Sequence, residues 1–357
     1  MHIKIDMDKA FGRVNLESLI KVMTQMGFST QWCNLIHQFI STTNLVVLVN
    51  SSPGNFFKPT RGLRQGNPLS PYLLLFCMET LSRYLIYAES QGLIHGTKIW
   101  NEAPTINHLL FADDCMIFCK ANMEECNNLI NIFQDFGQSC GQLINFAKSG
   151  IFFSKNTDPD IADNISDVMH VQRINITDKY LGSPLFTNRS KVQTFKPCVD
   201  KLKHRLAGWK TNLSTAGKVT MIQTVTSTLS IYQMNCFNIT NDTCKEIHVI
   251  QRDFFWNKEK DKSKGLFYIA WDTVNKPKDL GGLGFRNMEY FSIAMISKIA
   301  WRLIEEPNSL LRSIMKASHY PNQEVIRMDT KPKNTDSWIW KQILEVISCI
   351  KNITSGR

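Results

Sequence analysis

The order of apolar and polar residues in the first half of the chain predicts short strands. Residues 3–7 alternate between the two kinds of side chain, as a half-buried strand does. Within residues 108–119, two apolar runs rich in aromatic and aliphatic side chains flank the adjacent acids Asp113 and Asp114. Because Asp tolerates left-handed backbone angles, we predict a hairpin whose turn is formed by these two acids.

Helical periodicity covers most of the remaining chain. The predicted helices are, in order, 16–26, 31–40, 67–88, 123–136, 192–207, 215–229, 242–256 and 288–304. The third begins with Asn67 at the N-cap, followed by proline at the first helical position. A further strand is predicted at 43–50, before a turn at Pro53-Gly54.

These elements predict an α+β fold followed by a helical region. Strands give way to helices between Leu185 and Arg189, so we expect a domain boundary there. With 357 residues, the chain is long enough for two or three domains that each bury a core.

The chain is basic, with a net charge of +10. Such a charge favours a polyanionic partner. It is concentrated in residues 189–218, where one acid, Asp200, accompanies eight basic residues and leaves a net charge of +7. The eight are Arg189, Lys191, Lys196, Lys201, Lys203, Arg205, Lys210 and Lys218.

Cysteine usage and hydropathy limit where the protein would function. Ten cysteines occur without a Cys-x-x-Cys pair or a zinc-ligand spacing, so we expect free thiols and a reducing compartment. The longest apolar stretch, Leu73 to Met78, is too short to span a bilayer, and no signal peptide is evident. We expect an intracellular protein of the nucleus or cytoplasm, neither secreted nor in a membrane.

The acids of the predicted strand and hairpin are candidate metal ligands. Adjacent carboxylates repel and raise each other's pKa unless a positive charge lies nearby, and a divalent metal often supplies that charge. Asp6 shares the polar face of the first strand with Lys4. Taken alone, Asp113 and Asp114 fit a solvated turn at least as well as a metal site.

The segment from Arg61 to Pro71 is a candidate ligand-binding loop. It contains two glycines, which permit close approach of the backbone to a ligand, and the basic residues Arg61 and Arg64. The alternative is a plain glycine and proline turn before a helix.

Five segments in this order resemble the palm of a reverse transcriptase of the LINE-like, non-LTR retrotransposon type common in plants. The resembling blocks are 3–11, 61–71, 108–119, 141–149 and 180–185. Segments 213–218 and 276–284 resemble sequences downstream of the polymerase core in those elements, so the resemblance reaches about residue 305. Each motif is weak by itself, and the order and spacing of all five give the resemblance its weight.

The resemblance implies an RNA-directed DNA polymerase, a nucleotidyltransferase encoded by a transposable element. It implies a palm of antiparallel sheet and packed helices at 1–186, a basic helical thumb-like region at 187–257 and a partial C-terminal extension at 258–357. The fingers, the upstream endonuclease and a zinc-binding segment are missing, so the chain resembles an element truncated at both ends. We therefore expect weak binding of primer–template and no detectable polymerisation.

The resemblance also implies the catalytic residues. Two Mg²⁺ ions, or Mn²⁺, would be bound by Asp6, Asp113, Asp114 and the backbone carbonyl of Met7, and would stabilise the attacking and leaving oxygens of nucleotidyl transfer. Lys148 would protonate the leaving pyrophosphate.

Substrate contacts follow from the same resemblance. Phe11 would stack on the sugar and exclude a 2′-hydroxyl, although an isolated Phe fits a core position better. Arg64, Gln65 and Gly66 would contact the deoxynucleoside triphosphate and the template base. The RNA template and DNA primer would lie along Lys196, Lys201, Lys203, Arg205, Lys210 and Lys218. No specific protein partner is implied.

Two departures from the family pattern leave alternatives open. Family members usually carry Asp where this chain has Gly12 and Asn67; glycine loosens the backbone, whereas Asn caps a helix about as well as Asp. One alternative is a non-catalytic nucleic-acid-binding remnant that uses the basic helices. Another is an unrelated two-metal nuclease, which would need a further carboxylate cluster that the sequence does not contain.

Overall fold

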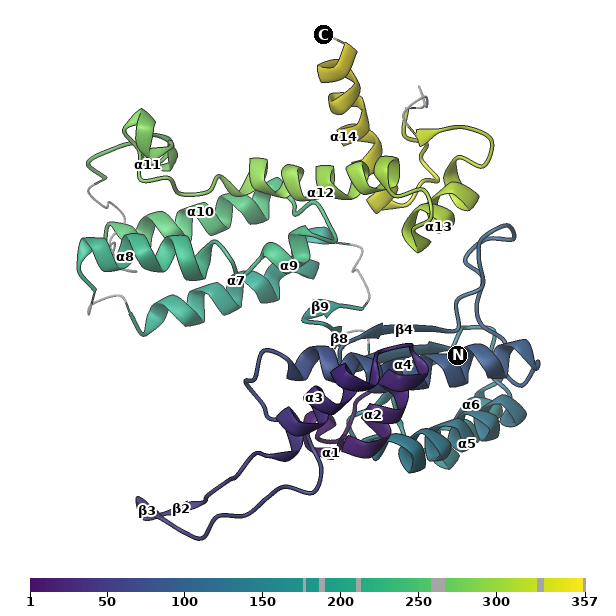
Figure 1. Cartoon of the computed structure of the whole chain (residues 1–357). Coiled ribbons are helices and arrows are strands. Elements are labelled where there is room, and N and C mark those ends of the chain that lie inside the picture. The colour runs from purple at the N-terminus through teal and green to yellow at the C-terminus, as the bar shows by residue number, and fades with distance from the viewer. Residues whose placement is uncertain (176–177, 186–189, 210–212, 258–266, 326–330, 356–357) are drawn as a thin grey trace. The chain divides into compact units, whose positions relative to one another are not determined.

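A computed structural model describes residues 1–175, 178–185, 190–209, 213–257, 267–325 and 331–355. The chain forms two compact units, Met1–Asn175 (unit 1) and Ile176–Arg357 (unit 2) (Figure 1). The division precedes the strand-to-helix boundary expected between Leu185 and Arg189, so residues 180–185 belong to unit 2. The finer division into palm, thumb-like region and extension stays a prediction.

Unit 1 is built on a five-stranded sheet with the order β4-β5-β1-β6-β7, antiparallel except for β6 and β7. The strands are β1 (His2–Ile5), β4 (His108–Phe111), β5 (Asp114–Phe118), β6 (Gly150–Phe152) and β7 (Gln172–Arg173). The alternation predicted for residues 3–7 is confirmed in β1, where Ile3 and Ile5 are fully buried and Lys4 is half-buried. One face of the sheet therefore packs on a core, and the other carries Lys4 together with apolar side chains such as Met116 and Phe118.

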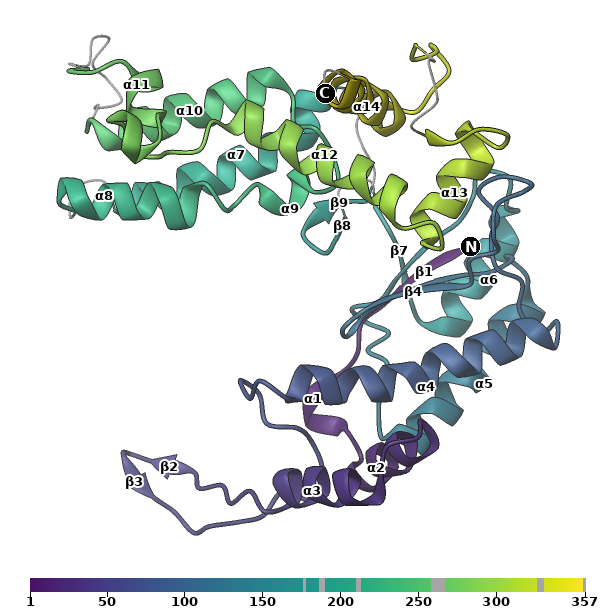
Figure 2. The same ribbon diagram turned by 45° about the horizontal axis from the view of Figure 1, so that its top comes forward.

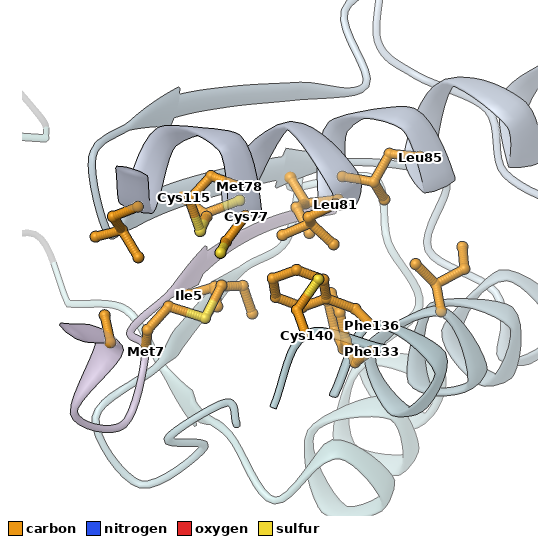
Figure 3. Close-up of a cluster of buried hydrophobic side chains, with 14 of the residues drawn as sticks. Ile5, Met7, Cys77, Met78, Leu81, Leu85, Cys115, Phe133, Phe136 and Cys140 are labelled. Atoms are coloured by element: carbon orange, nitrogen blue, oxygen red, sulfur yellow. The ribbon is translucent and has the colours of Figure 1, made fainter. Parts of the chain in front are cut away.

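Helices cover the apolar face of this sheet (Figure 2). They are α1 (Ala10–Arg13), α2 (Leu16–Gln25), α3 (Thr30–Ser41), α4 (Ser70–Ser90), α5 (Met123–Cys140) and α6 (Pro159–Met169). Figure 3 shows Ile5 of β1, Leu81 of α4 and Phe136 of α5 meeting in the core. Unit 1 thus has the α+β class expected from the sequence.

All cysteines of unit 1 lie in or beside this core. Cys33, Cys77, Cys115, Cys119, Cys126 and Cys140 are buried free thiols, as expected for a reducing compartment. Burial raises the pKa of Cys77, Cys115 and Cys119 to about 12. At neutral pH these side chains are small apolar groups and not nucleophiles.

Two local predictions in unit 1 are wrong. Asn67 does not cap α4, which begins at Ser70; its Oδ1 accepts the Leu69 N–H at 2.9 Å and forms a turn before the helix. Pro53 lies in strand β3 (Ser52–Pro53), which pairs with β2 (Leu48–Val49), and residues 50 and 51 form the turn. The strand expected at 43–50 is reduced to β2 and a single bridge at Leu45.

Where the structure describes unit 2, its regular elements are helices apart from one small hairpin, β8 (Lys179–Tyr180) and β9 (Ser183–Pro184). Its helices include α7 (Lys191–Ala207), α8 (Thr215–Met221), α9 (Ile231–Met234), α10 (Asn241–Phe255), α11 (Trp271–Asn275), α12 (Met288–Glu305), α13 (Leu310–His319) and α14 (Trp338–Ser355). They pack into two clusters, one around Phe195 and Phe254 and one around Trp340. No described helix is both long enough and apolar enough to cross a membrane.

The helix predicted over 215–229 differs from the structure in its second half. After α8 the chain continues as a π-helix, Ile222–Thr226, and then ends. The carbonyl of Ile222 accepts hydrogen bonds from the Ser227 N–H and from the hydroxyls of Thr226 and Ser227. Side-chain hydroxyls that compete for a helical carbonyl widen the turn, which periodicity does not predict.

Candidate metal and nucleotide site

The hairpin of β4 and β5 presents the two adjacent acids, but with its turn one residue earlier than predicted. Phe111 pairs with Asp114, so Ala112 and Asp113 form a two-residue turn and Asp114 is the first residue of β5. Ala112 has a φ of 53°, a left-handed conformation that costs a non-glycine residue about 1 kcal/mol or more. The register therefore fixes Asp114 on the sheet and leaves Asp113 at the tip.

Asp6 comes to the same place from a separate strand. The β1–β5 ladder pairs His2 with Phe118 and ends with Ile5 opposite Cys115, so Asp6 and Asp114 are the residues directly beyond its last pair. The carboxylate of Asp6 is near enough to raise the pKa of Asp114. Side chains opposite each other in an antiparallel pair share one face and lie roughly 4.5–5.5 Å apart at Cβ. Both acids are half-buried on the face of the sheet that carries Lys4. The strand order thus brings the first and third blocks together.

Like charges gather at this edge of the sheet. Burial raises the pKa of Asp114, and the carboxylates of Asp113 and Asp6 raise it further, while Lys4 opposes the change. A raised carboxyl pKa marks a place where negative charge is unfavourable unless a cation compensates it. A bound cation would therefore favour the ionised form of Asp114.

These donors suit a hard divalent ion. Mg²⁺ is usually held by one or two carboxylates together with water and substrate phosphate oxygens, and Asp6 and Asp114 supply two carboxylates. Within the described residues, no group of three or more His, Cys, Asp or Glu side chains is arranged to hold an ion. Asp113 therefore does not complete a three-carboxylate cage with the other two.

The loop at 141–149 packs against the end of β1. Met7 and Ile144 form an antiparallel bridge, in which the Asn145 N–H donates to the Asp6 carbonyl at 2.9 Å and the Asp8 N–H donates to the Leu143 carbonyl at 2.8 Å. This bridge does not use the Met7 carbonyl. Lys148 lies in the same loop and is exposed.

The loop at 61–71 is fixed to α1 by very close packing. The Leu63 N–H donates to the Phe11 carbonyl at 2.7 Å, and the Gly62 N–H donates to the Val14 carbonyl at 2.8 Å. A Cβ on Gly62 would lie 2.7 Å from the carbonyl oxygen of Gly12, and the φ of Gly62 is +91°. Phe11 is partly buried and packs against the core of unit 1. Glycine at position 62 is therefore required by geometry.

A cavity of about 610 Å³ opens beside this loop. Its wall includes the cations Lys9, Arg61 and Arg64 and the amide of Gln65. Apolar groups, among them Phe39 and Pro59, form another part of the wall, and no acid lines it. Arg64 and Gln65 thus come together as predicted for a nucleotide site, whereas Gly66 does not line the cavity.

Lys9 and Arg61 were not predicted as site residues. The signal for each was its place within a block, because Lys9 lies in block 3–11 and Arg61 begins block 61–71. Their convergence depends on the close contact between Gly12 and Gly62, which the sequence does not reveal.

In unit 2 the basic residues predicted to contact nucleic acid divide into several groups. Lys196, Lys201 and Arg205 are exposed on α7. Lys203 is also exposed and pairs with Glu246 at 2.6 Å. Lys210 lies outside the described residues.

Lys218 differs from these exposed residues. It is only 4% exposed and its Nζ donates to Asn257 Oδ1, just after α10. Burial lowers the pKa of this lysine. Its burial does not favour a contact with nucleic acid, and the prediction stays untested.

Comparison with known proteins gives concordant relatives. The family model described as reverse transcriptase (RNA-dependent DNA polymerase) matches residues 1–216. A putative ribonuclease H protein of Arabidopsis thaliana is 28% identical over 161 residues, which are 45% of this chain and 26% of that protein. An uncharacterized mitochondrial protein of the same plant is 30% identical over 119 residues, which are 32% of this chain and 74% of that protein.

A third relative comes from a mobile element. The retrovirus-related Pol polyprotein from the type-1 retrotransposable element R2 of Nasonia vitripennis is 29% identical over 116 residues, 32% of this chain and 10% of that protein. This chain therefore spans only a minor part of both the first and the third of these relatives. Because the family model covers more than half of the sequence, the chain belongs to the reverse transcriptase (RNA-dependent DNA polymerase) family, and its mobile-element relatives support the non-LTR type.

Proposed function

We propose that unit 1 holds the active site of RNA-directed DNA synthesis. The expectation that this chain does not polymerise detectably stays a prediction. The 3′-hydroxyl of a primer attacks the α-phosphate of a deoxynucleoside triphosphate, a new phosphorus–oxygen bond forms, and pyrophosphate leaves with the bonding electrons. The observation that carries this proposal is the β1–β5 pairing, which ends with Ile5 opposite Cys115 and so brings Asp6 and Asp114 to the same end of the two strands. Membership of the reverse transcriptase family supplies the class of reaction.

The carboxylates of Asp6 and Asp114 would hold Mg²⁺, with Asp113 and the Met7 carbonyl each one residue away. Bound there, the ion would polarise the primer hydroxyl and neutralise charge on the phosphate oxygens. The pKa of Asp114, which burial and the nearby acids raise, supports this assignment, since a cation would favour the ionised carboxylate.

The residues that line the cavity would bind the nucleotide. Lys9, Arg61 and Arg64 line the cavity without a neighbouring acid and would neutralise the triphosphate, as electrostatic catalysis of phosphoryl transfer requires. Gln65 would donate a hydrogen bond to the sugar or base, and Phe11 would stack on the sugar. Exposed Lys148 would give a proton to the pyrophosphate oxygen as it leaves.

Metal binding by Asp114→Asn tests the proposal most directly. Calorimetric Mn²⁺ titration should show binding to the wild-type chain that is weakened at least about 10-fold in the variant, because a charged ligand is lost. Asp167→Asn, which removes an exposed carboxylate of α6 in the same unit, is the matched control and should bind Mn²⁺ as the wild type does. Equal binding by all three proteins would contradict the metal site.

Primer extension on an RNA template separates catalysis from binding. Extension with Mg²⁺ or Mn²⁺ that disappears in Asp114→Asn would support nucleotidyl transfer by this chain. A second candidate function, nucleic-acid binding without catalysis, is favoured by the exposed Lys196, Lys201 and Arg205 of α7. It predicts primer–template binding that is the same in the wild type and in Asp114→Asn, without extension by either.

A further inference from the structure

Asp6 lies just beyond the part of β1 that the sheet holds. The ladder between β1 and β6 pairs His2, Ile3 and Lys4 with Phe152, Ile151 and Gly150, and β1 ends at Ile5. A residue outside a ladder lacks the strand partners that fix its backbone. A carboxylate that must hold an ion within a narrow geometry therefore needs another support at this position.

A side chain supplies that support. The Asp6 N–H donates to the hydroxyl oxygen of Ser149 at 3.1 Å, and the same hydroxyl donates to the carbonyl of Asn145 at 2.8 Å. The Asn145 N–H donates in turn to the Asp6 carbonyl at 2.9 Å. Both main-chain polar groups of Asp6 are thus bound by one closed ring of three residues, and Ser149 is only 4% exposed.

We infer that Ser149 is a positioning residue for the metal-binding carboxylate of Asp6. Its hydroxyl takes the place of the strand partner that is missing at the end of β1. The inference rests on the proposed function, because positioning Asp6 matters to a ligand only if Asp6 binds one. The role belongs to the hydroxyl group, since it accepts from Asp6 and donates to Asn145 at the same time.

The same loop connects Asp6 to the proposed proton donor. The Lys148 N–H donates to the carbonyl of Asn145 at 3.1 Å and to its Oδ1 at 3.2 Å. Asn145 therefore bonds to the backbones of both Asp6 and Lys148. Loss of the Ser149 hydroxyl would remove one side of this network and leave the partly buried Asp6 N–H without its acceptor.

The test compares three substitutions at position 149 by Mn²⁺ titration. Ser149→Ala and Ser149→Cys remove the strong acceptor and should weaken Mn²⁺ binding about 3- to 10-fold, as expected for the loss of one buried hydrogen bond. Ser149→Thr keeps the hydroxyl and should restore binding to within about twofold of the wild type. Ser154→Ala, which removes a hydroxyl from the exposed loop after β6, is the matched control and should have no effect.

Thermal unfolding of each variant in EDTA measures folding separately from metal binding. The cysteine variant keeps the side-chain volume, so its weakened binding with an unchanged fold would support positioning. Unchanged Mn²⁺ affinity in both Ser149→Ala and Ser149→Cys, or no recovery in Ser149→Thr, would overturn the inference. Failure of the proposed function gives a different result, in which Asp114→Asn binds Mn²⁺ as tightly as the wild type.

Discussion

At the residue scale, the glycines near the site differ in what they do. A Cβ on Gly12 would meet only the Lys9 Cβ, at 3.9 Å, which is an ordinary contact, so a side chain can start at this position. Gly62 is the opposite case, because its Cβ would meet the backbone of Gly12. Both positions are glycine in the sequence, and only the packing shows that one tolerates a Cβ and the other does not.

Substitution of Gly62 should be costly. In Gly62→Ala the new Cβ would clash with the carbonyl of Gly12 and the residue would keep a left-handed φ, so the free energy of unfolding should fall by roughly 2–4 kcal/mol. Gly66 also has a left-handed φ, +81°, but a Cβ there would meet nothing within 4 Å. Gly66→Ala should therefore lower the free energy of unfolding by only about 1 kcal/mol. Urea unfolding of both variants measures the difference, and equal losses would contradict the packing argument.

At the element scale, the β4–β5 hairpin, which carries Asp113 and Asp114, is bonded to α4 through His108. The Nδ1 of His108, at the start of β4, bonds to Asn107 Oδ1 at 2.5 Å, and its Nε2 bonds to the hydroxyl of Ser82 at 2.9 Å. An amide oxygen can only accept, so Nδ1 carries the proton and Nε2 accepts from Ser82 in the neutral ring. Burial lowers the pKa of His108, against the opposing influence of Glu79 and Glu89.

This anchor predicts a pH dependence of stability. Below the ordinary histidine pKa of 6.5 the unfolded chain takes up a proton at His108 that the folded chain does not, so the contribution present above that pH is lost as the pH falls. As the pH falls from about 7.5 to about 5.5, the free energy of unfolding should therefore decrease less in His108→Gln than in the wild type. Urea unfolding at each pH measures this. His37→Gln, at an exposed position of α3, should retain the wild-type pH dependence. A parallel fall in all three proteins would exclude His108 as a source.

The exposed basic residues of α7, Lys196, Lys201 and Arg205, predict a salt dependence of nucleic-acid binding. The double variant Lys201→Gln, Arg205→Gln should reduce the slope of log K against log salt by roughly 1.5 to 2, because two phosphate contacts are lost. Lys298→Gln with Lys316→Gln removes the same charge from exposed positions of α12 and α13. An equal reduction in the control pair would mean that net charge, and not α7, governs binding.

Four helices were predicted well because their signal is local, whereas helices α6, α9, α11, α13 and α14 were not predicted. The 3.6-residue period placed α2, α7, α10 and α12 within two residues of their observed ends. Turns were predicted less well, since pairing between strands sets the register that placed the hairpin turn at Ala112 and Asp113. The acids of the site were chosen through family resemblance, whereas Ser149, Lys9 and Arg61 gained their roles only from contacts across the fold.

At the scale of the whole molecule, the candidate metal site and the basic helix α7 belong to different compact units. Each unit has its own core, so each can open without the other. A single unfolding free energy would then not describe the chain. Measurements of stability at the metal site need a signal that comes from unit 1 alone.

The buried thiols of unit 1 provide such a signal without any added label site. All six of its cysteines are enclosed, whereas Cys349 in unit 2 is exposed. A short pulse of an alkylating reagent on the native protein should modify Cys349 at once and the six only when unit 1 opens, because a thiol must be exposed and ionised to react. Peptide mass spectrometry would then report the rate at which unit 1 opens, without any substitution in the protein. Early alkylation of Cys115, beside Asp114, would show instead that the hairpin opens by itself.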